Sequence, residues 1–150
     1  MKRMVSLAAI LAAIALVSGG ALAQFARTDD AIKYRQSVMF LIGQHFTRLG
    51  GMLKGSPAYD KGAFLKGATL VQTLAAMPWD AFLVPGSDKG SQMKDDTLKD
   101  TARFKEAAKA AESAMAGLVA ASGTGDVSAI QEPFGAVGKS CKNCHTAFRK

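Results

Sequence analysis

Cysteine and histidine are scarce in this chain of 150 residues, which contains two of each. The cysteines are Cys141 and Cys144, and the histidines are His45 and His145. A structural zinc site normally takes four ligands of these kinds, and the fourth would have to be the distant His45. A disulfide between the two cysteines would close a very short loop and stabilise little. The sequence therefore disfavours both a zinc domain and a fold held together by a disulfide.

Other absences narrow the class of protein. No segment after residue 23 carries the run of about 20 apolar residues that a membrane-spanning helix needs, and no stretch alternates as a strand does. The lysines are scattered without interleaved aromatic residues, so the formal net charge of +7 does not indicate binding of nucleic acid. Because neither paired carboxylates, a nucleophile–base pair nor a phosphate loop is evident, we expect a protein that is not an enzyme.

The few cysteines stand in one informative motif, Cys141-Lys142-Asn143-Cys144-His145. C-x-x-C-H is the attachment signature of c-type haem: two thiols add across the porphyrin vinyl groups and the adjacent imidazole ligates the iron. On a helix, these three side chains stand at i, i+3 and i+4 and leave one face together. A thioredoxin-like redox pair is the alternative, but no βαβ context surrounds the motif. We expect one haem c, held by two thioethers, with His145 as the metal ligand.

The first residues predict an export signal. Lys2 and Arg3 precede an apolar run over 4–17, and Ala-Leu-Ala at 21–23 is a small-x-small cleavage site. Cleavage after residue 23 would leave 127 residues, 24–150, as one domain, and loss of the two cations would lower the net charge from +7 to +5. Haem attachment of this type takes place outside the cytoplasm, so the expected location is the periplasm.

The rest of the chain predicts helices, because apolar residues recur at spacings of three and four. In the first helix they predict one inward stripe, made by Ile32, Arg35 (through its apolar stem), Met39, Ile42, Phe46 and Leu49. Thr28 is the expected cap of the first helix, and Gly50 and Gly51 are expected to end it. The expected helices are 28–49, 59–76, and a third that runs from 97 or 100 to 122. The segment 79–96 between the second and the third is expected to be an ordered surface loop, and a loop of this length in a compact domain is usually functional.

A fourth helix carries the motif. Asp126 is a ready N-cap for a helix that reaches Phe148. Pro133 leaves two arrangements open: the helix begins near Glu132 with the proline in its first turn, or a helix from Asp126 is kinked there. Four helices joined by mostly short loops predict an all-α, antiparallel four-helix bundle with covalent haem c near the C-terminus.

Several stretches resemble the cytochrome c′ family, c-type cytochromes built as four-helix bundles with haem near the C-terminus. They are Gln24-Phe25-Ala26, the run from Ala31 to Ser37, the pair Pro78-Trp79 with Phe82, and the stretch from Phe134 to Arg149. The similarity spans the whole chain from residue 24. An ordinary class I cytochrome c carries its motif near the N-terminus, so the position of the motif argues against that fold.

The resemblance implies roles for individual residues. Cys141 and Cys144 would form the thioethers and His145 would ligate the iron, while Met39 would cap the opposite, open face. Arg35 would pair with a haem propionate. The other residues that the resemblance, or their aromatic character, places at the haem are Gln36, Trp79, Phe82, Ser91 and Arg149.

In function, the resemblance implies five-coordinate, high-spin iron that binds NO and CO and cycles between the ferric and ferrous states. It also implies a homodimer packed through the first two helices. The exposed lysines at 139, 142 and 150 would suit docking of a redox partner protein, or they form only a solvated face. One alternative stays open: the sulfur of Met39 ligates the iron, which would make the protein a low-spin electron carrier.

Overall fold

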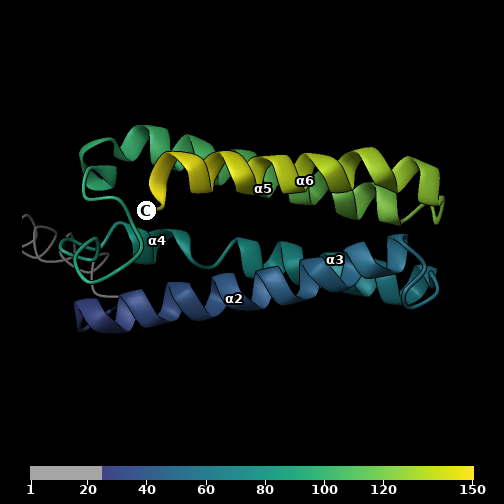
Figure 1. The fold of residues 1–150 in the computed structure, drawn as a ribbon, viewed down its shortest axis with the longest axis horizontal. Helices are drawn as coiled ribbons and strands as arrows, with labels where there is room; N and C mark the ends of the chain where they lie inside the picture. Colours follow the sequence, from purple (N-terminus) through teal and green to yellow (C-terminus); the bar gives the residue numbers. More distant parts are fainter. Residues whose placement is uncertain (1–24) are drawn as a thin grey trace, which may run out of the picture.

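The computed structural model describes residues 25–150 as a bundle of four long helices (Figure 1). They are α2 (Thr28–Leu53), α3 (Lys61–Ala75), α5 (Thr101–Ser122) and α6 (Val127–Phe148). Figure 1 shows α2 and α3 in one layer and α5 and α6 in the other, with consecutive long helices running in opposite directions. The predicted all-α four-helix bundle is confirmed. The predicted export signal, residues 1–23, lies outside the described residues.

Aspartates begin three of the four long helices. Asp60, Asp100 and Asp126 each accept a hydrogen bond from a backbone N–H of the first turn, which pairs a donor that the helix itself leaves free. The cap predicted at Asp126 is therefore confirmed. The cap predicted at Thr28 is wrong, because Thr28 is already helical and Arg27 is the N-cap, without a side-chain hydrogen bond. Acidic residues in the first turn stabilise this helix end through its dipole.

The end predicted for the first helix, at Gly50 and Gly51, is also wrong, since α2 continues to Leu53. Both glycines allow groups from other parts of the chain to come close to the backbone of α2. A Cβ at Gly50 would lie 3.1 Å from the Phe134 ring, and one at Gly51 would lie 2.5 Å from the carbonyl oxygen of Ser56. These positions therefore need glycine for packing, and the helical backbone passes through them.

The residue that stops the helix is Gly55, two positions after Leu53. Its φ of +81° lies in the left-handed region that favours glycine. The N–H of Ser56 donates to the oxygen of Gly51 at 2.9 Å, and the N–H of Gly55 donates to the oxygen of Met52 at 3.1 Å. This pair of reversed hydrogen bonds is the Schellman motif, which satisfies the last carbonyls of a helix.

The core lies between the two layers and follows the predicted apolar stripes. On α2, Arg35, Ile42 and Leu49 are buried, while Met39 and Phe46 are half-buried against the core. Full burial of one large apolar side chain stabilises the fold by about 1.5–3 kcal/mol. The large apolar side chains buried most completely are Phe64, Val71, Phe104, Met115, Leu118, Ile130 and Val137.

Pro133 lies inside α6, which is one helix from Val127 to Phe148. Of the two arrangements that the sequence left open, the structure has the helix that begins after Asp126. A proline there lacks the N–H that would bond to the carbonyl of residue 129. Ile130 and Phe134 flank it and are buried or half-buried in the core, so packing holds this part of the helix.

The connection between α3 and α5 consists mostly of turns, as predicted for 79–96. It contains one short helix, α4 (Trp79–Phe82), and ends in a 3-10 turn, η1 (Thr97–Lys99). The helix α5 then begins at Thr101, which agrees with the later of its two predicted starts. Within residues 25–150, no helix combines the length and apolar character needed to cross a membrane.

Candidate haem-binding site

The three motif side chains lie on one helix, α6, as predicted. Cys141 packs against the core, in line with Val137 four residues before it. With about 100° between successive residues, Cys144 is rotated by about 60° to one side of Cys141 and His145 by about 40° to the other. Neither cysteine is in a disulfide. The two thiols and the imidazole therefore spread over a single arc of the helix surface, wide enough to hold one edge of a planar group.

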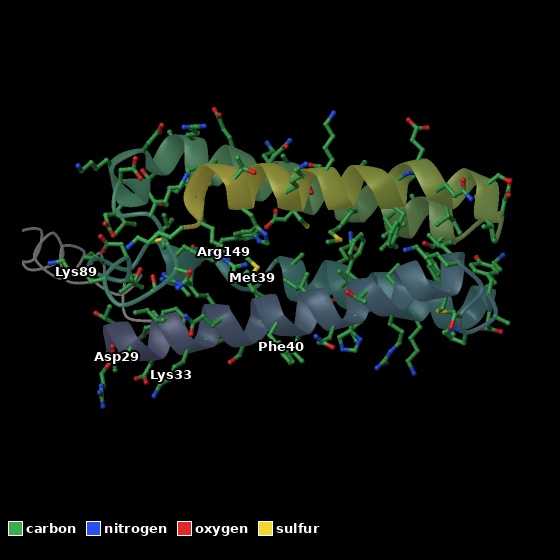
Figure 2. All side chains as sticks on the ribbon, in the orientation of Figure 1. Asp29, Lys33, Met39, Phe40, Lys89 and Arg149 are labelled. Atoms are coloured by element: carbon green, nitrogen blue, oxygen red, sulfur yellow. The ribbon has the colours of Figure 1, made fainter. Side chains whose placement is uncertain are left out.

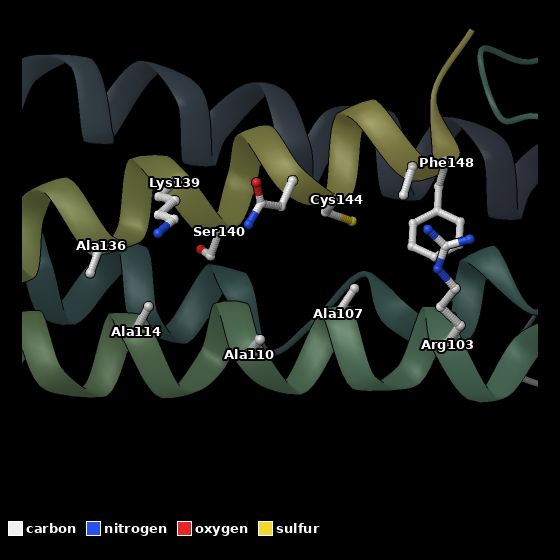
Figure 3. A pocket seen from close by; sticks show the side chains of 11 residues that line it. Arg103, Ala107, Ala110, Ala114, Ala136, Lys139, Ser140, Cys144 and Phe148 are labelled. Carbon is white, nitrogen blue, oxygen red and sulfur yellow. The ribbon is translucent and has the colours of Figure 1, made fainter.

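Cys144 opens onto a groove of about 390 Å³ between α5 and α6. Figure 3 shows the Cys144 side chain on the α6 wall, with the alanines of α5 opposite it. Arg103 and Lys139 also line this groove. Because the alanines opposite Cys144 carry only methyl groups, space remains beside the thiol. The small residues along the groove are Ala107, Ala110, Ala114, Ala136, Ser140 and Ala147.

His145 lies on the other side of α6, on the face toward α2. That face is identified by Phe134, whose ring stacks on Phe46 of α2 with centroids 4.2 Å apart. His145 follows Phe134 by eleven residues, which brings it to within about 20° of the same heading. The imidazole is exposed, so it is accessible to a group that enters from this side.

The Phe46–Phe134 contact also fixes which residues of α2 face the motif. Because α2 and α6 run antiparallel (Figure 1), seven residues back along α2 and seven forward along α6 reach the same level, about 10 Å from that contact. Met39 is therefore level with Cys141. Figure 2 shows Met39 pointing from α2 into the space between the helix layers, whereas Phe40 points away from the bundle.

Local surroundings set the protonation of the motif. Burial raises the pKa of both thiols, and the pKa of Cys144 is raised further by the charge of Cys141. The pKa of His145 is lowered, first by partial burial and then by the positive charge of Arg149. Both causes favour the neutral imidazole, which is the form that ligates a metal.

Arg35, which the sequence placed at the haem edge, is buried to 2% exposure and bound to the loop after α4. Its Nη1 donates to the oxygen of Ala81 at 3.0 Å and to Ser87 Oγ at 2.8 Å. Its Nη2 donates to the backbone oxygen of Ser87 and to Ser91 Oγ, the latter at 2.9 Å. The guanidinium carbon lies 4.7 Å from the centroid of the Phe82 ring. Among the residues that the structure describes, four of the five N–H donors of this arginine are thus engaged and Nε–H is left.

Ser87 is a residue of this cluster that the sequence analysis missed. It is completely buried, and both its hydroxyl and its carbonyl accept from Arg35. One sequence pattern could have indicated Ser87: the pair Gly86-Ser87 is repeated four residues later as Gly90-Ser91. Both glycines have positive φ, +78° and +69°, so each turns the chain just before a serine that contacts Arg35.

The aromatic residues predicted at the site form a cluster with α5. Trp79, Phe82 and Phe104 have ring centroids between 5.2 and 6.3 Å apart. Within residues 25–150, the buried Nε1–H of Trp79 has no hydrogen-bond partner, which leaves a donor for a ligand. Gln36, in contrast, is exposed on α2. The structure thus joins Trp79, Phe82, Arg35 and Ser91 in one neighbourhood, and Gln36 lies on the outer face.

Arg149 lies just beyond the end of α6, next to His145. It follows the end of α6 with extended backbone, φ −108° and ψ 138°, and its N–H donates to the oxygen of His145 at 2.9 Å. Its positive charge adds to the effect of burial in lowering the pKa of His145. The backbone of Arg149 is therefore fixed to the last turn of α6 at His145.

Comparison with known proteins agrees with the motif on α6 and with the four-helix bundle. The family model described as Cytochrome C′ matches residues 30–149. The chain belongs to the cytochrome c′ family. Cytochrome c′ from Alcaligenes xylosoxydans xylosoxydans is 39% identical over 127 residues, which cover 85% of this chain and 98% of that relative. The resemblance stated from the sequence is confirmed.

Solved structures agree with this membership. The crystal structure of cytochrome c′ from Rubrivivax gelatinosus matches with a TM-score of 0.79 and 40% identity, over 85% of this chain and 100% of that one. A nitric oxide complex of a variant of cytochrome c prime from Alcaligenes xylosoxidans matches with a TM-score of 0.79 and 38% identity, over 85% of this chain and 98% of that one.

Haem c is the covalent cofactor of this family, so the cofactor predicted from the sequence is confirmed. The residues present fit it: two unpaired thiols three positions apart, an accessible neutral imidazole beside them, and small side chains facing Cys144. Zinc needs a cluster of ligands. In the part of the chain that the structure describes, no group of three or more His, Cys, Asp or Glu side chains could hold a metal ion.

Proposed function

We propose that this cytochrome c′ is a periplasmic haem protein with five-coordinate, high-spin iron, which binds NO and CO and cycles between the ferric and ferrous states. The observation that carries the proposal is the position of Met39, a half-buried apolar side chain that faces α6 at the level of Cys141. The solved relative in complex with nitric oxide supports the choice of ligand.

Within this proposal, the chain binds the haem on one side and restricts access on the other. Cys141 and Cys144 would hold the haem covalently through their sulfurs, and His145 would supply an imidazole ligand for the iron. Bound haem supplies an iron that takes neutral diatomic gases and single electrons. Met39 covers the opposite side with an apolar side chain, which excludes water and larger ligands by steric clash. We assign the protein to binding and redox roles, and not to the enzymes.

The neighbouring residues would hold the periphery of the haem. Within residues 25–150, the Nε–H of Arg35 and the indole N–H of Trp79 are donors available for a propionate. Phe82 provides an apolar wall and Ser91 supports Arg35. Arg149 adds positive charge on the side of His145. Gln36, being exposed, is the weakest of the predicted contacts.

The periplasmic location rests on the residues that predict an export signal, Lys2, Arg3, the apolar run 4–17 and the small residues at 21–23. Covalent haem attachment outside the cytoplasm requires such export. Fractionation of cells that express the full chain tests it: haem-stained protein in the periplasmic fraction, shortened by 23 residues, is the expected result.

Electronic absorption spectra of the purified holoprotein test the proposed coordination. We expect high-spin spectra in the ferric and ferrous states, with a clear change when NO or CO is added to the ferrous protein, because Met39 only covers the iron. A low-spin spectrum with a sulfur-to-iron band, unchanged by CO, would instead establish the alternative, in which Met39 is the second ligand and the protein is an electron carrier.

A homodimer through the first two long helices is part of the proposal. Large apolar side chains are exposed on these helices, Phe40 at 65%, Leu41 at 42% and Leu70 at 41%, and just after α3, Met77 at 42%. Sedimentation equilibrium is expected to give twice the monomer mass, and Phe40→Glu is expected to weaken association at least about tenfold because a buried unpaired charge is costly. Ser113→Glu on α5 is the matched control. A monomeric wild-type protein would contradict the dimer.

A further inference from the structure

The chain after α6 is tied to the loop between α4 and η1. The N–H of Lys94 donates to the oxygen of Phe148 at 2.9 Å, and the N–H of Lys150 donates to the oxygen of Gln92, also at 2.9 Å. These two bonds place Met93 opposite Arg149 in an antiparallel bridge. Arg149 is thereby held by its neighbours in the bridge and by its own N–H bond to α6.

Two side-chain contacts reinforce the bridge. Lys150 Nζ lies 2.6 Å from Asp95 Oδ1, and Lys94 Nζ donates to the oxygen of Thr146 at 2.9 Å. Both contacts are exposed, and exposed pairs of this kind contribute about 0–1 kcal/mol. The last residues of a chain fray unless something ties them down, so the bridge needs a firmer anchor than these contacts.

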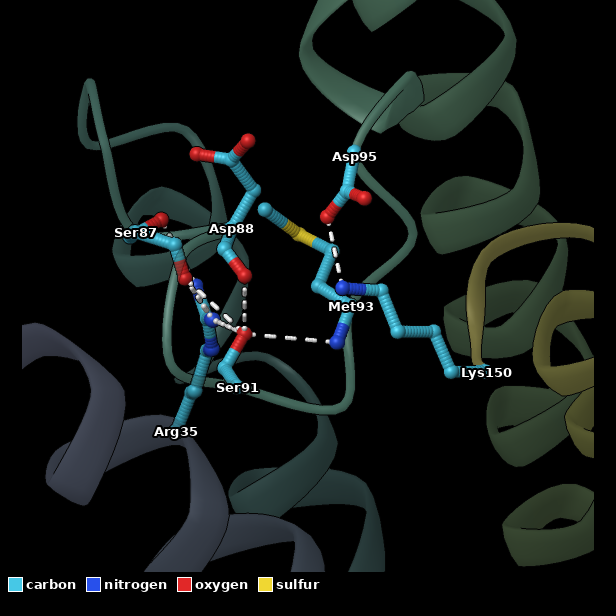
Figure 4. A network of polar contacts seen from close by, with 7 residues as sticks. All are labelled: Arg35, Ser87, Asp88, Ser91, Met93, Asp95 and Lys150. Carbon is cyan, nitrogen blue, oxygen red and sulfur yellow. Dashed lines mark hydrogen bonds and ion pairs between the residues drawn. The ribbon is translucent and has the colours of Figure 1, made fainter.

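The side-chain oxygen of Ser91, Oγ, provides that anchor (Figure 4). This atom accepts a hydrogen bond from Arg35 Nη2 at 2.9 Å and another from the N–H of Met93 at 3.3 Å. The hydroxyl proton can go to the oxygen of Ser87 or to that of Asp88, each at 3.0 Å. Ser91 therefore links the buried guanidinium on α2 directly to the bridge residue that faces Arg149.

The far end of this link is rigid. Arg35 is buried, and its other hydrogen bonds fix it to Ala81 and Ser87, which are also buried. A charged group in such a position is costly to move, because its hydrogen bonds would have to be replaced by water that cannot reach it. Movement of the loop relative to α2 is therefore opposed at Ser91.

We propose that Ser91 is a positioning residue: through Arg35 on one side and Met93 on the other, it holds the backbone of Arg149 so that the guanidinium stays beside His145. The proposal rests on the proposed function in one respect, since it concerns an Arg149 that lies next to an iron-bound His145. In this role Ser91 acts through the loop and the bridge, and direct contact between its hydroxyl and the haem is not needed.

Ser91→Ala in the holoprotein is the test, with two readouts. Hydrogen exchange is expected to show at least a tenfold faster exchange of the Lys94 amide, because the bridge loses its link to Arg35. The reduction potential is expected to fall, because a cation that moves away from the iron no longer favours the less positive ferrous state. Ser91→Thr keeps the hydroxyl and is expected to restore both values.

Ser122→Ala is the matched control. Ser122 is completely buried, and its hydroxyl donates to the oxygen of Leu118 at 2.6 Å. It lies at the C-terminal end of α5, outside the loop and the bridge. The variant is expected to lose stability while the Lys94 amide and the reduction potential stay at their wild-type values.

Two results would overturn the proposal. If Ser91→Ala leaves the exchange of the Lys94 amide unchanged, Ser91 does not anchor the bridge. If the amide exchanges faster but the potential does not move, the bridge does not position Arg149 for the haem. Failure of the proposed function is seen separately, as a wild-type ferrous protein that does not respond to CO, whereas the exchange readout does not depend on gas binding.

Discussion

Replacement of both motif cysteines, Cys141→Ser and Cys144→Ser together, is expected to abolish covalently retained haem. A thioether requires a thiol, and the sequence has no other cysteine that could take over. Acid–acetone extraction separates covalent from dissociable haem. After extraction the wild-type protein is expected to keep its haem absorbance, and the double variant is expected to keep none.

His145→Ala is the informative companion, because it changes the iron ligand and leaves both thiols in place. It is expected to retain haem colour after extraction, with an altered spectrum, whereas the double cysteine variant loses the colour. Haem colour that survives extraction of the double variant would contradict thioether attachment at these positions. Wild-type protein that gives up all its haem on extraction would contradict covalent attachment through Cys141 and Cys144.

The sequence predicted the architecture because its signals were local and mutually consistent. Apolar spacing of three and four indicated each helix, and Asp126 marked the start of α6 correctly. The predicted end of the first helix was wrong because tertiary contacts overrode a local sequence rule. Gly50 and Gly51 look like a helix end, yet they sit within α2 because Phe134 and the Ser56 carbonyl approach them.

The candidate site was predicted less completely, because its contacts join residues far apart in the chain. Apolar periodicity placed Arg35 on the inner stripe of α2, but nothing within α2 indicates Ser87 or Ser91, which lie 52 and 56 residues away. Arg149 lies just beyond α6, which ends at Phe148 as predicted. Its position depends on pairing with Met93, and the sequence offers no periodic signal for a single bridge.

The position of Met39 opposite the motif likewise depends on a contact between residues far apart in the chain. Periodicity put Met39 on the inner face of α2, and the family resemblance put it over the iron. Only the register between α2 and α6, fixed by the Phe46–Phe134 stack, brings it level with Cys141. That position places the Met39 side chain opposite the motif, and substitutions that change its volume and its sulfur separately distinguish a steric cap from a sulfur ligand.

Met39→Ala is therefore expected to raise the affinity of the ferrous protein for CO at least about tenfold, which corresponds to about 1.4 kcal/mol. The wild-type side chain is half-buried between the helix layers, and a gas molecule must displace it to reach the iron. Alanine removes the free-energy cost of displacing the side chain and leaves the apolar surroundings in place. Titration of the ferrous variant with CO, followed by absorbance, measures the change.

Met39→Leu separates the two roles of the residue, because leucine keeps an apolar side chain of similar volume and removes the sulfur. If Met39 is a cap, the leucine variant is expected to retain the wild-type spectra and a CO affinity within about threefold, since the steric barrier is preserved. If the sulfur ligates the iron, the same change would convert a low-spin spectrum to a high-spin one and create CO binding that the wild-type protein lacks. The conversion would refute the five-coordinate proposal, because a cap that makes no bond to iron cannot set its spin state.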